Sequence, residues 1–319
     1  MNISQENINF KIARDFGETF NISVKFLRQN FSSFFICLLF LAGPFILSYS
    51  LILAHYDSVI IDKTALVKAG LLYNIKIYNW EYFLSLLLQI LSYLSIICTT
   101  YSYMIVYSEK GKGNFTVADV AKKMNAHIGK ITGGFLLYSF LTTIFIVALV
   151  YIIGMIGNSS NFFGVLMVIL IFIGILLVGP NLLWQINTVF LVILIENEIP
   201  LSAYGRTREV MKDNFWWTWL LVVCGLFTIS LLSVLFLLPS YLYTLINYYG
   251  TAESVQETSI LYIIVSAVCT FLGTITNSIF YVISTFHYYS LAEKKDGKGL
   301  LERINEIGIS QKNITEQQF

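Results

Sequence analysis

Charged side chains are the scarcest feature of this sequence. Only 12% of its 319 residues are Asp, Glu, Lys or Arg, whereas 56% are apolar. Soluble domains contain about 25% charged and about 45–50% apolar residues. A soluble fold of this size could not remove so much apolar surface from water. The composition therefore excludes an ordinary soluble domain and predicts an integral membrane protein.

Residues that carry chemistry are also few. The four cysteines lie in apolar stretches and form no CxxC pair: Cys37, Cys98, Cys224 and Cys269. Such cysteines behave as small apolar residues. The three histidines are far apart in the chain: His55, His127 and His287. Because no hydrolase, metalloprotease or nucleotide-binding fingerprint is present, the sequence predicts no enzymatic activity, no cofactor, no metal site and no nucleic-acid partner.

Six apolar blocks are long enough to cross a hydrocarbon core of about 30 Å, which requires roughly 20 helical residues. None of them contains Asp, Glu, Lys or Arg, and none alternates as a barrel strand would. The blocks are 33–54, 82–107, 133–155, 162–195, 215–238 and 260–289. The predicted fold class is all-α, a six-helix transmembrane bundle in a single integral membrane domain that comprises residues 1–319.

The distribution of Lys and Arg predicts the orientation of this bundle. Seventeen of the twenty basic residues lie before the first block, after the last one, or in the connections 108–132 and 196–214. Positive charge resists translocation, so these segments are expected on the cytoplasmic side. With an even number of spans, both termini are then cytoplasmic.

An internal repeat accompanies the blocks. Polar segments led by Glu109, Glu196 and Glu293 each follow the end of a block, at separations of 87 and 97 residues. This spacing predicts one structural unit used three times. The units, each an interfacial amphipathic helix followed by a transmembrane hairpin, are expected at 10–107, 114–195 and 200–289, with a cytoplasmic tail at 290–319.

The first two interfacial helices have clear apolar faces. In the first, over 12–31, the predicted lipid-facing residues are Phe16, Phe20, Leu27 and Phe31, which share one side at helical spacing. The second, over 116–131, is expected to begin at Thr116 with Asp119 three residues on. The third begins at Pro200, a suitable first helical residue. These helices either set the tilt of the spans that follow, or form a docking surface for anionic lipid or a partner.

Neutral polar residues line one face of the second, fourth and sixth spans. The stripes comprise Ser85, Gln89, Ser92, Ser95, Thr99 and Ser102; Asn181, Gln185 and Thr188; and Thr270, Thr274, Asn277, Tyr281 and Ser284. They either hold helices together through hydrogen bonds or line an uncharged pathway or lipid groove. The amides Gln89, Asn181, Gln185 and Asn277 have too many donors and acceptors to face lipid. We expect them in the bundle interior near Gly179 and Pro180, which break the long fourth helix.

Three segments carry a resemblance to a known family. The segments are 14–31, with Arg14-Asp15-Phe16-Gly17-Glu18; 196–217, with Glu196-Asn197-Glu198-Ile199-Pro200; and 287–300, with His287-Tyr288-Tyr289-Ser290-Leu291. Their pattern resembles the membrane region attached to some glycerophosphoryl diester phosphodiesterases and the related YciC-like bacterial membrane proteins. The resemblance implies a bacterial cytoplasmic (inner) membrane location. It does not imply phosphodiesterase activity, which resides in a separate barrel of some 250 residues.

Two functions are compatible with these features. The first is a non-enzymatic scaffold or subunit of a membrane protein assembly, with membrane lipids and a protein partner or a second copy as its contacts. The alternative is a carrier or lipid-handling protein that uses the polar stripes of the second, fourth and sixth spans.

Overall fold

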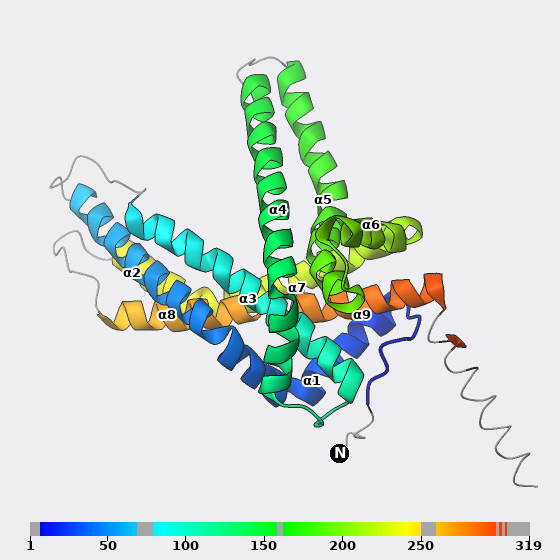
Figure 1. The fold of residues 1–319 in the computed structure, drawn as a ribbon. Helices are drawn as coiled ribbons and strands as arrows, with labels where there is room; N and C mark the ends of the chain where they lie inside the picture. Colours follow the sequence, from blue (N-terminus) through cyan, green and yellow to red (C-terminus); the bar gives the residue numbers. More distant parts are fainter. Residues whose placement is uncertain are drawn as a thin grey trace, which may run out of the picture. The chain divides into compact units, whose positions relative to one another are not determined.

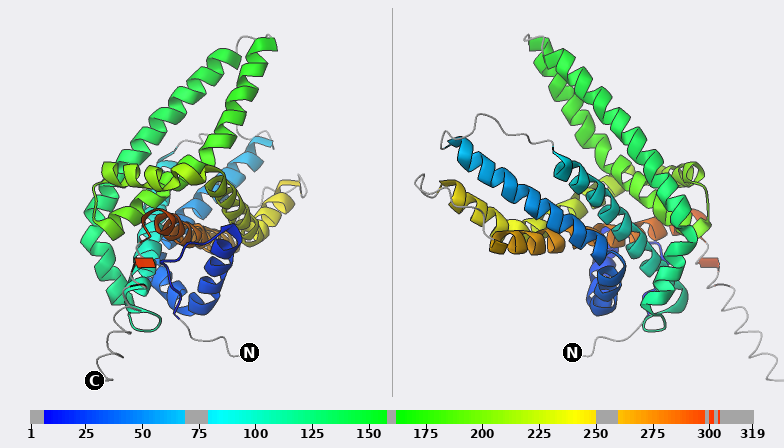
Figure 2. Two further views of the ribbon diagram at one scale, coloured as in Figure 1. Left: turned by 90° about the vertical axis from the view of Figure 1, so that its right-hand side faces the viewer. Right: turned by 60° about the vertical axis from the view of Figure 1, so that its left-hand side comes forward.

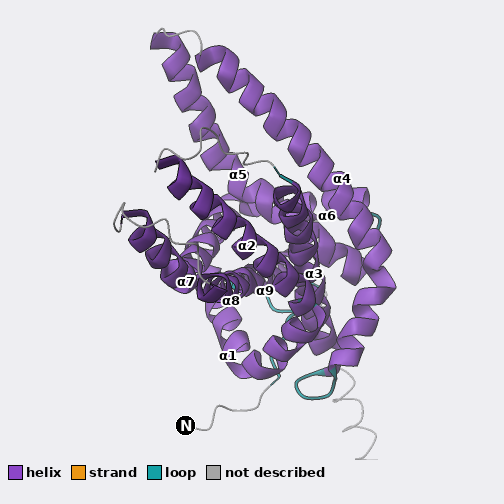
Figure 3. Cartoon of the chain, turned by 90° about the vertical axis from the view of Figure 1, so that its left-hand side faces the viewer, coloured by secondary structure: helices purple, strands orange, loops and turns teal. Residues whose placement is uncertain are grey.

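The structure is a computed structural model that describes residues 7–68, 79–157, 162–249, 260–297, 300, 301 and 304. Over these residues the chain is helical and contains no strand, which confirms the predicted all-α fold (Figures 1 and 3). The helices are α1 (Phe16–Leu41), α2 (Gly43–Lys68), α3 (Trp80–Lys110), α4 (Val117–Gly157), α5 (Phe162–Glu196), α6 (Pro200–Met211), the 3-10 helix η1 (Lys212–Asn214), α7 (Phe215–Tyr249), α8 (Ile260–Ile275) and α9 (Asn277–Asp296).

Seven helical stretches among the described residues are long and apolar enough to cross a membrane. The sequence predicted six, and the additional stretch arises because the first apolar block, 33–54, is divided between α1 and α2. The division falls at Ala42, where Pro44 is the second residue of α2. Proline is favourable in a first helical turn but cannot continue a preceding helix, so the Gly43-Pro44 pair starts a new helix.

The chain forms two compact units. Unit 1 comprises Met1–Phe31, Tyr101–Cys224 and Tyr281–Phe319, and unit 2 comprises Ser32–Thr100 and Gly225–Phe280. In unit 2, α2 packs along α8 (Figure 2), and the Ser92 hydroxyl of α3 donates to the Phe45 carbonyl of α2 at 2.9 Å. In unit 1, α4 and α5 form a hairpin and α6 packs on both. The boundaries of the two units do not coincide with those of the predicted repeats.

The beginning of the chain differs from the prediction of a helix over 12–31. Residues 12–15 form no regular secondary structure, and α1 begins at Phe16 and continues to Leu41 without the expected interruption before the span. A capping box explains the start: the Glu18 N–H donates to Asp15 Oδ1 at 2.8 Å, and the Asp15 N–H donates to Glu18 Oε2 at 3.2 Å. Two orphan donors are thereby satisfied. The spacing of Asp15 and Glu18 carries this signal in the sequence.

The non-helical segment before α1 is fixed to the rest of unit 1. Phe10 is buried and contacts the rings of Phe26, Tyr107 and Phe286. The backbone of Arg14 forms a reciprocal pair with the Ser290 hydroxyl, which accepts from the Arg14 N–H at 2.8 Å and donates to the Arg14 carbonyl at 2.9 Å. This segment is therefore an integral part of the unit 1 core.

The second predicted interfacial helix begins where expected but is not a separate element. The Thr116 N–H and hydroxyl both donate to Asp119 Oδ2, at 2.8 and 3.0 Å, and α4 starts at Val117. The helix then continues through the predicted junction at residue 132 and spans 41 residues in all. By contrast, α6 is a distinct 12-residue helix, which η1 connects to α7.

A left-handed residue follows each of three helices at the polar segments of the predicted repeat. Gly111 follows α3, Asn197 follows α5 and Gly297 follows α9, with φ values of 79°, 55° and 62°. Such a residue turns the chain away from the helix axis, and glycine and asparagine tolerate this conformation best. The amide N–H groups of Gly111 and Gly297 donate to the carbonyls of Tyr107 and Glu293. The same local ending thus occurs three times.

Candidate functional site

The polar face predicted on the fourth span is buried in unit 1. Asn181 and Gln185 are only 1% and 5% exposed, and Thr188 and Trp184 are fully enclosed. The four residues recur at intervals of three and four along α5, so they share one helix face. The sequence identified the amides and Thr188, but Trp184 was missed because it is apolar apart from its single N–H group.

Most polar atoms on this face have no partner among the described residues. Gln185 Nε2 donates to the Met211 sulfur at 3.5 Å. Gln185 Oε1, both amide atoms of Asn181, Trp184 Nε1 and the Thr188 hydroxyl have no hydrogen-bond partner within the described part of the chain. Each buried unpaired group costs about 1–3 kcal/mol. The face is therefore able to bind water or another polar group.

The other two predicted amides belong to unit 2. Gln89 on α3 and Asn277 on α9 are each half-buried. The Asn277 side chain donates to the Thr274 carbonyl at 2.9 Å. This bond satisfies the amide N–H within its own stretch of chain, as expected of a residue with a packing role. Of the four amides expected to cluster, two thus lie in each unit. Contact between the amides of the two units stays a prediction.

The predicted break at Gly179 and Pro180 lies inside a helix that continues on both sides. Proline has no N–H group, so the carbonyl four residues earlier, that of Leu176, has no helical donor. The indole N–H of Trp219 on α7 donates to this carbonyl at 3.0 Å. A side chain from another helix thereby replaces the bond that Pro180 removes.

The predicted lipid-facing stripe lies on the less buried side of α1. Phe16, Phe20 and Leu27 are half-buried, and Phe31 is 63% exposed. The buried side of this helix is instead formed by Thr19, Ser23, Phe26 and Asn30. Lipid contact of the stripe stays a prediction.

His287 is a buried residue whose contacts the sequence did not reveal. Its Nε2 lies 2.9 Å from the Thr218 hydroxyl, and its ring meets that of Trp184 edge-on at a centroid distance of 5.3 Å. A histidine that activates a nucleophile is normally oriented by a carboxylate. No carboxylate contacts His287 among the described residues. Thr218 and His287 thus have the hydrogen bond between nucleophile and histidine that is found in a catalytic triad, but they lack its carboxylate.

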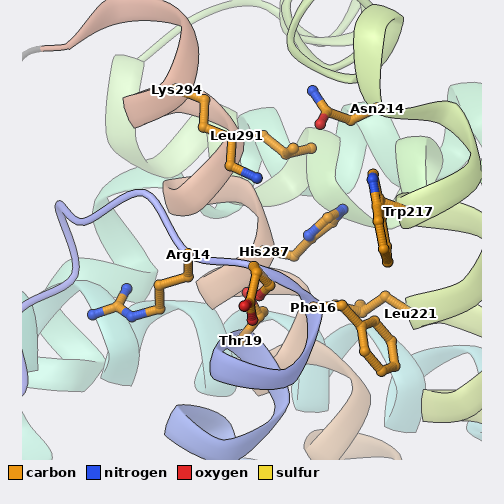
Figure 4. A pocket seen from close by; sticks show the side chains of 10 residues that line it. Arg14, Phe16, Thr19, Asn214, Trp217, Leu221, His287, Leu291 and Lys294 are labelled. Carbon is orange, nitrogen blue, oxygen red and sulfur yellow. The ribbon is translucent and has the colours of Figure 1, made fainter.

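A cavity of about 160 Å³ lies beside His287, between the start of α1, the start of α7 and α9 (Figure 4). Its polar lining includes Lys294, Asn214 and Asp15, and its apolar lining includes Trp217 and Leu221. The side chains come from parts of the chain far apart in sequence. Proximity in the fold therefore creates this cavity, and no local motif marks it.

Arg14 borders the same cavity but is already occupied. Its guanidinium donates to the backbone carbonyls of Asn9 and Phe10 and lies 5.8 Å from the Phe286 ring centre. Burial lowers the pKa of Arg14, and the nearby Glu18 carboxylate partly offsets this effect. The side chain therefore holds the amino-terminal segment in its folded-back course and contacts α9 through the Phe286 ring.

A second arginine connects α6 to the ends of α5 and α9. Arg206 pairs with Asp296 and with Glu196, at 3.4 Å for the latter. The Tyr288 hydroxyl also donates to Glu196, at 3.0 Å. One side chain of the third amphipathic helix therefore joins two of the predicted Glu-led segments, those at Glu196 and Glu293.

None of the cysteines Cys37, Cys98, Cys224 and Cys269 forms a disulfide within the described part of the chain. The described residues also contain no group of three His, Cys, Asp or Glu that could bind a metal ion. Comparisons of the chain with protein-family models, with curated proteins and with solved structures found no match. The structural class is therefore defined by the fold alone: a helical protein that has, among its described residues, seven long apolar stretches suited by length and composition to cross a membrane.

Proposed function

We propose that this protein is a non-enzymatic subunit of a membrane protein assembly, in which the α4–α5 hairpin binds a transmembrane helix of a partner. The observation that supports this proposal most directly is the exposure of the hairpin. Only 6% of the most apolar 18-residue window of each helix is buried, compared with 44% for the stretch Ile260–Asp296.

Open glycine positions support a helical partner over lipid alone. Apart from the adjacent backbone of the same helix, no atom of the described residues lies within 4 Å of the position that a Cβ would occupy at Gly154 on α4 or at Gly174 on α5. Glycine in a transmembrane helix permits close approach of another backbone, and small residues are enriched at such contacts. A partner helix that packs on these positions would bury apolar surface that the chain itself leaves exposed.

The proposal retains six spans, three repeats and cytoplasmic termini. The first half of α1 carries Glu18, Lys25 and Arg28, and a charged residue at the centre of a span costs about 2.5–3.5 kcal/mol. We therefore assign this half to the membrane interface and the remainder, together with α2, to the first crossing. The three left-handed helix endings at Gly111, Asn197 and Gly297 support the repeat.

Site-specific photo-crosslinking tests the proposal. A crosslinking residue at Val150, one turn before Gly154 and 62% exposed, should yield one protein adduct of discrete mass in the native membrane. Gly154→Leu and Gly174→Leu should abolish this adduct by blocking close approach. A probe at Leu235 on α7, which is 67% exposed, should yield only lipid adducts. Absence of a discrete protein adduct at Val150, or its persistence in both leucine variants, would contradict the proposal.

The unpaired polar face of α5 favours a second candidate, a carrier for an uncharged polar or lipidic molecule. Asn181 and Gln185 would then bind the molecule or the water that accompanies it. Under this alternative, Gln185→Leu and Asn277→Leu should leave folding and assembly intact but abolish transport in reconstituted vesicles. Unchanged transport in both variants would exclude a role for these amides in a pathway.

A further inference from the structure

The cavity beside His287 combines a polar rim with an apolar wall. Lys294 and Asn214 reach it from α9 and η1, whereas Phe16, Trp217 and Leu221 form much of its apolar side (Figure 4). The rings of Phe16 and Trp217 are 6.5 Å apart. A ligand that matches this lining must have a charged group directly connected to an apolar body.

The polar groups of the rim are available to a ligand. Within the described part of the chain, Lys294 makes no ion pair, although its neighbour Lys295 pairs with Glu209 at 2.7 Å. The Asn214 side chain likewise has no hydrogen-bond partner among the described residues. Ammonium and amide N–H groups are both donors, so together they are suited to the oxygen atoms of a phosphate group.

The surroundings of the cavity match the headgroup region of a bilayer. Trp216 and Trp217 are 63% and 57% exposed, and tryptophan is enriched at membrane–water interfaces. The cavity volume of about 160 Å³ is well above the roughly 10–15 Å³ that one water requires. It therefore has room for a headgroup, while the acyl chains of the same molecule could lie outside it along exposed apolar surface.

An acidic side chain distinguishes between types of headgroup. Asp15 also lines the cavity, and its Oδ1 accepts a hydrogen bond from the Glu18 N–H. A carboxylate near a phosphate repels it, unless the ligand also carries a positive charge that can pair with the acid. Because the Arg14 guanidinium is held by the Asn9 and Phe10 carbonyls, the charged and amide groups left to a ligand are Lys294, Asn214 and Asp15. This set is better suited to a zwitterionic headgroup than to a purely anionic one.

We propose that this cavity binds the headgroup of a zwitterionic phospholipid, with the phosphate at Lys294 and Asn214 and the ammonium group directed toward Asp15. The apolar wall formed by Phe16, Trp217 and Leu221 contacts the glycerol and the upper part of the acyl chains. This site goes beyond the proposed assembly function and does not depend on it, because no residue of the α4–α5 hairpin lines the cavity.

Native mass spectrometry of the full chain in mild detergent tests the proposal. Phosphatidylethanolamine should bind with a stoichiometry of one at this site and more tightly than phosphatidylglycerol. Lys294→Gln should weaken phosphatidylethanolamine binding about tenfold or more, because it removes a charge-assisted hydrogen bond to the phosphate. Lys295→Gln, which removes a neighbouring lysine already paired with Glu209, is the matched control and should bind as the wild type does.

Two further measurements test the role of Asp15 and distinguish a lipid phosphate from free inorganic phosphate. Asp15→Asn, which retains a side-chain acceptor at the start of α1, should reduce the preference for phosphatidylethanolamine over phosphatidylglycerol. Inorganic phosphate at millimolar concentration should not displace the lipid. Equal binding by Lys294→Gln and Lys295→Gln, or an unchanged preference in Asp15→Asn, would overturn the assignment. Displacement by inorganic phosphate would identify a free-anion site instead.

Discussion

The bond between Trp219 and the Leu176 carbonyl provides the sharpest test of the packing in unit 1. Trp219→Phe removes the indole donor but retains an aromatic ring. In the wild type, the Leu176 carbonyl then loses the only side-chain donor that it has within the described part of the chain, at 3.0 Å, and Pro180 cannot supply a backbone N–H. In a Pro180→Ala background, residue 180 regains an N–H that can bond to this carbonyl, so the same substitution should matter less.

The expected magnitudes follow from the cost of an unpaired carbonyl. The bond lies on the exposed side of the two helices, where hydrocarbon offers no alternative donor, and an acceptor left unsatisfied there costs about 1–3 kcal/mol. Trp219→Phe should therefore destabilise the wild type by about this amount plus a smaller packing loss, but should destabilise the Pro180→Ala protein by the packing loss alone. The packing term cancels in the double-mutant cycle, which leaves a coupling free energy of about 1–2 kcal/mol.

Unfolding by sodium dodecyl sulfate titration in mixed micelles would measure the free energy of unfolding of the four proteins. Trp217→Phe is the matched control, because the Trp217 indole has no hydrogen-bond partner among the described residues, and it should show no coupling with Pro180→Ala. Distant substitutions usually add within about 0.3–0.5 kcal/mol. Additivity of Trp219→Phe and Pro180→Ala within that range would refute the inference that Trp219 replaces the bond that Pro180 removes.

Three more predictions concern the start of α1, the ion pairs of α6 and the topology. Asp15→Ala should destabilise the first turn of α1 by about 0.5–2 kcal/mol and speed hydrogen exchange at the Glu18 amide, whereas an unchanged exchange rate would contradict the capping box. Arg206→Ala should lower the free energy of unfolding by about 1–3 kcal/mol, because it removes the guanidinium that Asp296 and Glu196 share. High salt should not reproduce the loss, because the Arg206 and Asp296 side chains are only 18% and 20% exposed. In a cysteine-free background, Lys112→Cys and Glu198→Cys should react with an impermeant maleimide only in inside-out vesicles. Labelling of either site from outside would reverse the orientation.

Local features of the fold were predictable from neighbouring residues. The composition and the length of the apolar blocks indicated the membrane class, and the Thr116–Asp119 pair indicated the start of α4. The Asp15–Glu18 spacing contained the same information for α1 but was outweighed by an apolar periodicity that extended back to Ile12. A capping box acts on specific N–H groups, whereas periodicity reports only a shared face, so the cap decides where the helix begins.

Features that depend on residues far apart in the chain were decided only by the tertiary structure. The sequence placed Asn181 and Gln185 on one side of a helix, but it could not show that Trp184 completes this side or that His287 contacts it. The bond from Trp219 to the Leu176 carbonyl joins residues 43 positions apart. Periodicity specifies which direction a side chain takes from its own helix axis. Which side chain meets it there depends on how the helices pack, and that packing also creates the cavity beside His287.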